Sequence, residues 1–138
     1  MSRRAGFTLI ELLIVVVIIG ILAGIAIPKF ASSREKAYVS QIKSDLRNLA
    51  TAQEQYFQDY QIYATVTTAG LKSATGLVTW KPTTGTLIIA AGTAGNVNGW
   101  NAQLAHPGTT VTCSLWQGAS GSGVFIGSGQ MEGDVTCY

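Results

Sequence analysis

The stretch that decides the fold runs from Phe7 to Ile27 and reads FTLIELLIVVVIIGILAGIAI. Its 21 residues carry a single charge, on Glu11. As an α-helix the stretch would be about 31 Å long at 1.5 Å per residue. That length matches the hydrocarbon thickness of a bilayer, which is roughly 30 Å. We therefore expect one membrane-spanning helix near the N-terminus.

An ordinary signal peptide is the alternative, because Arg3 and Arg4 supply a basic region and Gly24 to Ala26 offers a small-residue cleavage site. Two features favour a retained helix. A charged residue at the centre of a membrane helix costs about 2.5 to 3.5 kcal/mol, and a segment used only for export would gain nothing from Glu11. In addition, the helical period continues after Ile27, so the apolar stretch reads as the first half of one long helix.

The chain after Pro28 shows an amphipathic pattern. Its apolar residues recur every three or four positions, with one polar interruption at Gln53, and they are Val39, Ile42, Leu46, Leu49, Tyr56 and Tyr60. The charged residues are expected largely on other faces, and they are Lys36, Lys43, Asp45, Arg47 and Asp59. The pattern predicts an amphipathic helix over residues 29–63, whose apolar stripe needs a partner.

Beyond Tyr63 the sequence changes to short β-prone runs divided by Gly, Pro, Asn and Thr. The expected strands are Leu77–Trp80, Thr86–Ala91, Trp100–Ala105, Thr110–Trp116 and Val124–Ile126. An antiparallel sheet of three to five such strands should cover the apolar stripe of the helix. The predicted fold class is therefore α+β, with a long N-terminal helix packed on a C-terminal antiparallel β-sheet in residues 64–138.

Composition limits the classes of function. A chain of 138 residues holds one ordinary domain plus an anchor. Nine Lys and Arg against seven Asp and Glu make the chain nearly neutral, whereas a protein that binds duplex nucleic acid usually shows a clustered basic face, so nucleic acid is not a default partner. The single histidine, His106, and the absence of a Cys/His cluster or a catalytic spacing predict no catalytic residue, no metal and no cofactor.

The run MSRRAG followed by FTLIELLIVVVIIGILAGIAIPKF resembles the class III leader and N-terminal helix of type IV pilins and type II secretion pseudopilins. The resemblance is close over the first 30 residues, looser along the following helix, and mainly architectural beyond Thr65. In that family a prepilin peptidase cuts after the glycine and methylates the new N-terminus. The resemblance implies a leader over residues 1–6, cleavage between Gly6 and Phe7, and N-methylation of Phe7.

The residue types at this terminus have physical reasons. Arg3 and Arg4 hold the leader in the cytoplasm, because cytoplasmic flanks prefer positive charge. Gly6 offers the peptidase a backbone without a side chain. After cleavage the cationic amine of Phe7 can be neutralised by Glu11 of a neighbouring subunit. Because an unpaired buried charge is costly, we expect Glu11 to set the axial register between subunits.

Three residues should weaken the apolar helix. Pro28 lacks a backbone donor, which predicts a kink, and Gly20 and Gly24 each cost about 1 kcal/mol relative to Ala. Membrane helices also tolerate Gly and Pro freely, which is the plainer interpretation. The family resemblance implies that this part of the 7–28 membrane-spanning and filament-core helix partly unwinds in assembled fibres.

Cys113 and Cys137 lie in the C-terminal quarter, which the apolar segment would carry across the membrane. Export permits a disulfide. The family resemblance points the same way, because many pilins close a C-terminal surface loop with one. Two free thiols are the alternative.

The resemblance implies a structural subunit of a type IV pilus that supports adhesion, motility or DNA uptake. The precursor would sit among the lipids of the cytoplasmic (inner) membrane as a single-pass protein, and the assembled subunit would lie in an extracellular pilus. The implied partners are identical or homologous pilin subunits, the prepilin peptidase, and an inner-membrane assembly platform with its ATPase.

Three other functions remain open. A type II secretion pseudopilin often carries calcium near its C-terminus, where only Glu132 and Asp134 offer carboxylates, which is thin for six to eight ligands. A ligand- or DNA-binding minor pilin would need a basic groove with aromatic residues. The candidates for that groove are Lys72, Lys81, Trp80 and Trp100. An enzyme tethered by a signal anchor has no residue set to support it.

Overall fold

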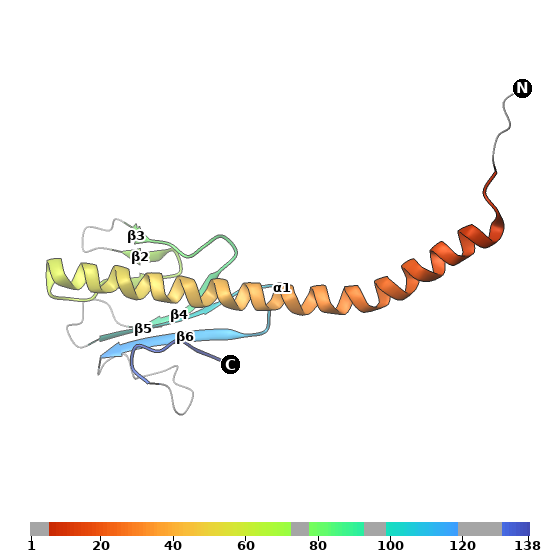
Figure 1. Cartoon of the computed structure of the whole chain (residues 1–138). Coiled ribbons are helices and arrows are strands. Elements are labelled where there is room, and N and C mark those ends of the chain that lie inside the picture. The colour runs from red at the N-terminus through yellow and green to blue at the C-terminus, as the bar shows by residue number, and fades with distance from the viewer. Residues whose placement is uncertain (1–5, 73–77, 93–98, 119–130) are drawn as a thin grey trace, which may run out of the picture. The chain divides into compact units, whose positions relative to one another are not determined.

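A computed structural model describes residues 6–72, 78–92, 99–118 and 131–138. The chain divides into two compact units, residues 1–34 and residues 35–138, and each is described by itself. In chain order the elements are α1 (Leu9–Tyr60), β1 (Thr65–Thr67), β2 (Gly70–Lys72), β3 (Val78–Trp80), β4 (Leu87–Gly92), β5 (Gly99–Ala105), β6 (Thr112–Gly118) and β7 (Thr136–Cys137) (Figure 1).

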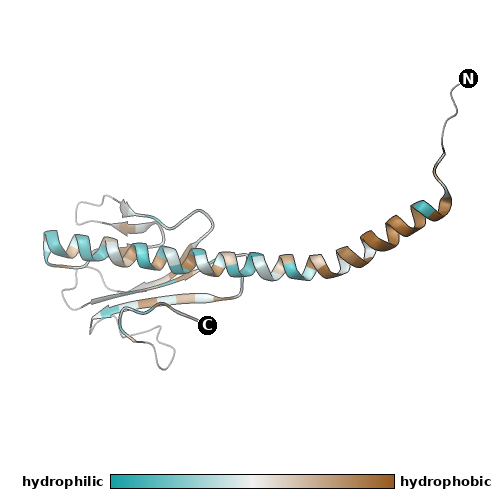
Figure 2. Cartoon of the chain, viewed as in Figure 1, coloured by the Kyte–Doolittle hydropathy of each residue, from teal (hydrophilic) through white to brown (hydrophobic). Residues whose placement is uncertain are grey.

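The first unit contains the N-terminal part of α1, whose large apolar side chains are exposed from Leu9 to Phe30. In Figure 2 the ribbon of this part is coloured hydrophobic over most of its length. By length and composition, α1 is the one helix in the described part of the chain that could cross a membrane. A helix with apolar residues all round needs lipid or other helices as its surroundings.

The second unit begins at Glu35, and its part of α1 ends at Tyr60, three residues before the predicted boundary at residue 63. Gln61 stops the helix in a left-handed conformation with φ of 57°. Its N–H still donates to the carbonyl of Phe57 at 2.8 Å. Such a left-handed residue is a common helix terminator, although glycine usually fills the position.

The strands of the head form two antiparallel sheets, with orders β1-β2-β3 and β4-β5-β6-β7, where a single sheet was expected. The sequence did not indicate β1, β2 or β7, because strands of two or three residues are too short to show alternation. Gly70 makes the first sheet possible. It has φ of 124°, and a Cβ there would lie 2.2 Å from the carbonyl oxygen of Trp80 on β3.

Four of the five predicted strands match β3, β4, β5 and β6, with ends that shift by one or two residues. The fifth, Val124–Ile126, lies outside the described residues. The α+β class, with one long N-terminal helix packed on antiparallel strands, is confirmed.

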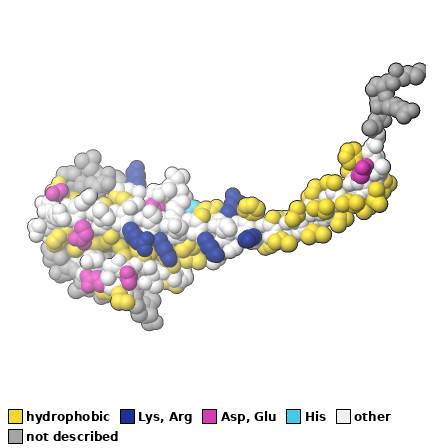
Figure 3. Space-filling view, in the orientation of Figure 1, with side chains coloured by type: hydrophobic (Ala, Val, Ile, Leu, Met, Phe, Trp, Pro, Cys, Tyr) yellow, Lys and Arg dark blue, Asp and Glu magenta, His cyan; other side chains and the backbone are white. Residues whose placement is uncertain are grey.

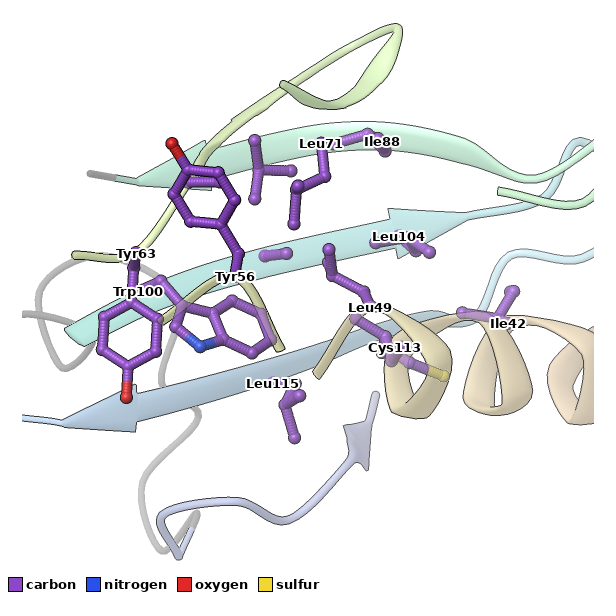
Figure 4. Packing of buried hydrophobic residues seen from close by; sticks show 14 residues of the cluster. Ile42, Leu49, Tyr56, Tyr63, Leu71, Ile88, Trp100, Leu104, Cys113 and Leu115 are labelled. Carbon is purple, nitrogen blue, oxygen red and sulfur yellow. The ribbon is translucent and has the colours of Figure 1, made fainter. Parts of the chain in front are cut away.

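The core of the head lies between the C-terminal part of α1 and the two sheets (Figure 4). Its buried apolar residues are Ile42, Leu46, Leu49, Tyr56, Tyr63, Ala64, Val66, Leu71, Ile88, Trp100, Ala102, Leu104, Cys113 and Leu115. The predicted stripe supplies the helical members of this set. Val39 is half-buried at one end of the stripe, and Tyr60 at the other end is 53% exposed, so the prediction that Tyr60 faces the core is wrong.

Two polar residues of α1 are also buried. Gln53, which interrupts the apolar pattern, is completely inaccessible, and its side chain bonds to the backbone of Ala64. Asp45, which was expected on another face, is 3% exposed. Its carboxylate accepts hydrogen bonds from the backbone N–H of Thr83 at 3.1 Å and from the Thr83 hydroxyl at 2.7 Å. Both side chains therefore satisfy backbone groups of the loops that cross the helix.

Candidate assembly and processing site

The predicted cleavage point is accessible. Gly6 and Phe7 are both exposed, and the Phe7 side chain is 83% accessible. A Cβ built on Gly6 would meet no atom within 4 Å. The described structure therefore does not require a glycine at this position, and the role of Gly6 in cleavage stays a prediction. Arg3 and Arg4 lie outside the described residues.

Thr8 and Glu11 form a reciprocal capping arrangement at the start of α1. The Oε2 atom of Glu11 accepts from the backbone N–H of Thr8 at 2.8 Å and from the Thr8 hydroxyl at 2.6 Å. The N–H of Glu11 donates in turn to Oγ1 of Thr8 at 3.3 Å. This is the capping box, whose signature is Ser or Thr followed three residues later by Glu or Gln. Sequence reasoning considered Glu11 alone and missed Thr8, although the spacing was visible.

The capping box changes the interpretation of Glu11. The carboxylate is not an isolated charge in an apolar helix, because Thr8 supplies two donors from the same chain. Both of those bonds use Oε2, and Oε1 accepts no hydrogen bond from any residue that the structure describes. A cationic amine from another subunit could therefore bind Oε1 without breaking the cap. Thr8 directly follows Phe7, so the cap also survives cleavage before Phe7.

The three residues expected to weaken the helix lie within an uninterrupted α1. The helix runs through Gly20, Gly24 and Pro28 without a break. Pro28 cannot donate the helical hydrogen bond to the carbonyl of Gly24, so this turn is held less strongly than its neighbours. A Cβ on Gly20 or Gly24 would meet nothing within 4 Å. Unwinding between these residues is not seen here and stays a proposal for the assembled state.

Cys113 and Cys137 are joined by a disulfide with an S–S distance of 2.04 Å and a Cα–Cα distance of 4.0 Å. They are directly opposed in the antiparallel register of β6 and β7. Beside them, Thr112 and Tyr138 exchange backbone hydrogen bonds of 2.9 and 3.0 Å. Cys113 is completely buried. The disulfide thus fixes the two-residue strand β7 to the edge of the larger sheet.

The remaining chemically interesting residues have structural partners. His106 stacks on Tyr38 with ring centroids 4.0 Å apart, and its Nδ1 accepts from the N–H of Gly108. Glu132 accepts from the N–H of Gly118 at 2.6 Å. Within residues 6–72, 78–92, 99–118 and 131–138, no three His, Cys, Asp or Glu side chains gather in a way that could hold a metal ion.

Comparison with known proteins gives a motif match at this terminus and several similar proteins. Residues 1–27 match the prokaryotic N-terminal methylation motif. The chain is 36% identical over 114 residues to the type IV major fimbrial protein FimA of Dichelobacter nodosus, covering 83% of this chain and 65% of that protein. It is 50% identical over 62 residues to the type IV major pilin protein PilA of Myxococcus xanthus, covering 45% of this chain and 28% of that protein.

A second group of relatives comes from secretion systems. The chain is 40% identical over 73 residues to type II secretion system core protein G of Klebsiella pneumoniae, covering 53% of this chain and 51% of that protein. The chain spans 28%, 51% and 65% of the lengths of these three curated relatives.

The apolar helix, the capped N-terminus and the antiparallel head define a class of helix-anchored subunits with an N-terminal methylation motif. Within that class, the methylation motif and these relatives support membership of the family of type IV pilins and type II secretion pseudopilins.

Proposed function

We propose that this chain is the structural subunit of a type IV pilus, built into a filament through its N-terminal helix. The observation that carries the proposal is the apolar surface of α1 between Leu9 and Phe30. Every large hydrophobic side chain in this range is about half exposed or more. Such a surface cannot stay in water. It has two possible surroundings, lipid before assembly and the helices of other subunits afterwards.

Processing precedes assembly in this proposal. The precursor spans the cytoplasmic (inner) membrane, and a prepilin peptidase cuts between Gly6 and Phe7 and methylates the new amine. The exposed Gly6–Phe7 bond and the match of residues 1–27 to a methylation motif support this order. An inner-membrane platform with its ATPase then moves the subunit from lipid into a filament that leaves the cell surface.

Moving α1 from lipid into a bundle of helices brings little hydrophobic gain, since lipid tails are as apolar as the side chains. Close packing must supply the free energy, and small residues four apart allow two helices to approach closely. Gly20 and Gly24 have this spacing, and a Cβ built on either would meet nothing within 4 Å. The pairing of a Phe7 amine with Oε1 of Glu11 in a neighbour would add the polar contribution and fix the register.

A type II secretion pseudopilin is the second candidate, and the observation that favours it is the group of core protein G relatives at 38% to 41% identity, for example 41% over 83 residues in Vibrio cholerae. The two candidates share processing and helix packing. They differ in where the filament ends, in the periplasm for a pseudopilus and outside the cell for a pilus.

The test is to shear surface material from cells that express the chain, to collect filaments by sedimentation, and to sequence the N-terminus of the subunit. Long fibres that begin at methylated Phe7 are expected for a pilus. Gly6→Leu should leave full-length precursor in the membrane and no fibres, whereas Ser2→Leu, in the same leader, should be processed. Processed subunit of normal size from Gly6→Leu would contradict the cleavage assignment, and fibres confined to the periplasm would favour the pseudopilin.

A further inference from the structure

Three cationic side chains of the head lie on one face of α1. Lys36, Lys43 and Arg47 are spaced by seven and four residues, which places them within about 40° of one another around a helix of 3.6 residues per turn. Lys36 and Arg47 are exposed and Lys43 is partly exposed. Figure 3 shows Lys and Arg side chains following one another along this element. We call these three residues the basic face.

The basic face has no charged or hydrogen-bonded partner among the described residues of its own chain. Across the described ranges, none of its three side chains makes an ion pair or a hydrogen bond. Lys43 and Arg47 also stand four residues apart, and like charges at this spacing destabilise a helix. The isolated subunit therefore gains nothing from the arrangement, which points to a partner outside the chain.

Acidic side chains gather at the end of the head where α1 stops (Figure 3). Glu54, Asp59 and Glu132 are all exposed, and we call them the acidic pole. Glu54 accepts a hydrogen bond of 3.3 Å from the hydroxyl of Tyr63. Glu132 lies near enough to contribute to the raised pKa of Tyr63.

Asp59 makes the acidic pole unfavourable in the isolated subunit. It stands in the last turn of α1, and no basic residue occupies that turn. The helix macrodipole favours cations at this end and opposes a carboxylate. None of the three acidic residues has an ion pair in the part of the chain that the structure describes. Among the residues that the structure describes, both charged surfaces therefore lack a partner of opposite sign.

We propose that the basic face of one copy of this chain binds the acidic pole of an adjacent copy in the filament. The proposal rests on the proposed function, because it needs parallel copies displaced along the filament axis. A displacement of seven residues, about 10 Å, sets Arg47 of one copy at the axial level of Glu54 of the next. A displacement of eleven residues, about 16 Å, does the same for Lys43.

A polyanion fits the basic face less well than a second copy. Basic segments that bind anionic surfaces usually gather four to eight Lys and Arg residues, and the basic face has three. Glu54 follows Arg47 after seven residues and stands on the same side of α1, where it would repel a long anionic chain. In a homopolymer, by contrast, each basic face meets an acidic pole at a fixed ratio of one to one.

Zero-length cross-linking with a carbodiimide tests the contact on intact sheared filaments, since the reagent joins an amine to a carboxylate only where the two touch. We expect cross-linked peptides that join Lys36 or Lys43 to Glu54, Asp59 or Glu132. Lys43 and Glu54 of one helix are eleven residues, about 16 Å, apart, so a link between them must join two copies. The same subunits dispersed in detergent should give none, and high salt during cross-linking should lower the yield.

Charge reversal gives the second test. Arg47→Glu or Glu54→Arg should each lower filament yield about two- to fivefold, as expected for exposed ion pairs repeated along a fibre. The double variant should recover yield, because it exchanges the two signs. Lys81→Glu reverses an exposed charge outside both surfaces and should assemble like the parent. Thermal unfolding of each variant subunit separates an assembly defect from misfolding.

The outcomes are distinguishable. Parent filaments without these cross-links, and with yields insensitive to the reversals, would overturn the contact while leaving the pilin function intact. Parent cells without any filaments would overturn both. Filaments that give no cross-links but lose retention on immobilised DNA upon Lys43→Glu would assign the basic face to a polyanion and would also overturn the proposal.

Discussion

The side-chain amide of Gln53 makes two hydrogen bonds with the backbone of Ala64, donating from Nε2 to the carbonyl and accepting at Oε1 from the N–H, each at 2.9 Å. Gln53 is inaccessible and Ala64 is 3% exposed. The amide thus pairs with the backbone of the segment that leaves α1, as the backbone of a neighbouring strand would. It holds the chain at the point where the helix gives way to the first sheet.

Replacing Gln53 by leucine should destabilise the head by about 2 to 4 kcal/mol, because both backbone groups of Ala64 would be left buried without partners. Urea unfolding of the purified subunit in detergent, followed by tryptophan fluorescence, measures the change. Gln55→Leu is the matched control, since Gln55 is exposed two residues away on the same helix. Equal stability of the two variants would show that Ala64 finds other partners.

The same residue shows why sequence reasoning reached the architecture but not every contact. Apolar periodicity predicted the stripe of α1, and alternation predicted β5 and β6, because both patterns follow from burial of one face. Gln53 and Asp45 break the apolar rule, since each is buried to satisfy the backbone of a distant loop. No local pattern shows where Ala64 or Thr83 will cross the helix, so these two contacts could not be predicted.

The terminus was predicted in part for a different reason. The apolar run, the single charge and the leader motif are all local, so Gly6, Phe7 and Glu11 could be proposed as site residues from the sequence. The capping role of Thr8 is equally local and was available from its three-residue spacing to Glu11. The pairing of two charged surfaces between copies depends on which side chains find no partner within the chain, and only the structure shows that.

Tyr63 should make the head lose stability at alkaline pH. Burial raises the pKa of its hydroxyl above the ordinary value of about 10, and the carboxylates of Glu54 and Glu132 raise it further. Because the folded-state pKa is the higher one, the stabilisation is complete below about pH 10 and is lost as the pH rises through the folded-state value. Unfolding free energies of the parent should therefore fall above about pH 10.

Tyr63→Phe tests this assignment, because it removes the titrating group and keeps the ring that stacks on Phe57. When the free energy of unfolding is plotted against pH, the parent curve should fall more steeply than the variant curve between about pH 9.5 and 11. The two curves should be parallel at neutral pH. Tyr138→Phe, at an exposed tyrosine, provides the control. If the free energy of unfolding of Tyr63→Phe fell as steeply as that of the parent, the loss of stability at alkaline pH would belong to another group.

Glu11 should matter for assembly rather than for insertion. Glu11→Val removes a charge from the apolar helix, so the subunit should be processed and should stay in lipid at least as well as the parent. Its filaments should be sparse, because the Phe7 amine of a neighbour would remain unpaired. Membrane fractionation and the yield of sheared filaments measure the two effects separately.

Thr8→Val separates the cap from the charge. It removes the hydroxyl that bonds to Oε2 but keeps the backbone N–H of Thr8 and the carboxylate of Glu11. Loss of an N-cap side chain costs about 1 kcal/mol, so we expect assembly to weaken less than in Glu11→Val. Parental filament yield from Glu11→Val expressed alone would show that Glu11 does not set the register.

The disulfide should carry a large share of the stability of the head. Cys113 and Cys137 are 24 residues apart, and chain-entropy arithmetic for a loop of this size gives about 3.5 kcal/mol. Typical domain stabilities are about 5 to 15 kcal/mol. The structure explains the dependence, because β7 has two residues and is held by one ladder beside the disulfide.

We expect the processed subunit to resist alkylation until it is unfolded and reduced, as mass spectrometry would show. The Cys113→Ser/Cys137→Ser variant should unfold at a lower urea concentration than the parent. Thiols that alkylate in the unfolded but unreduced protein would refute the pairing, and an unchanged urea midpoint in the double variant would show that β7 is held without it.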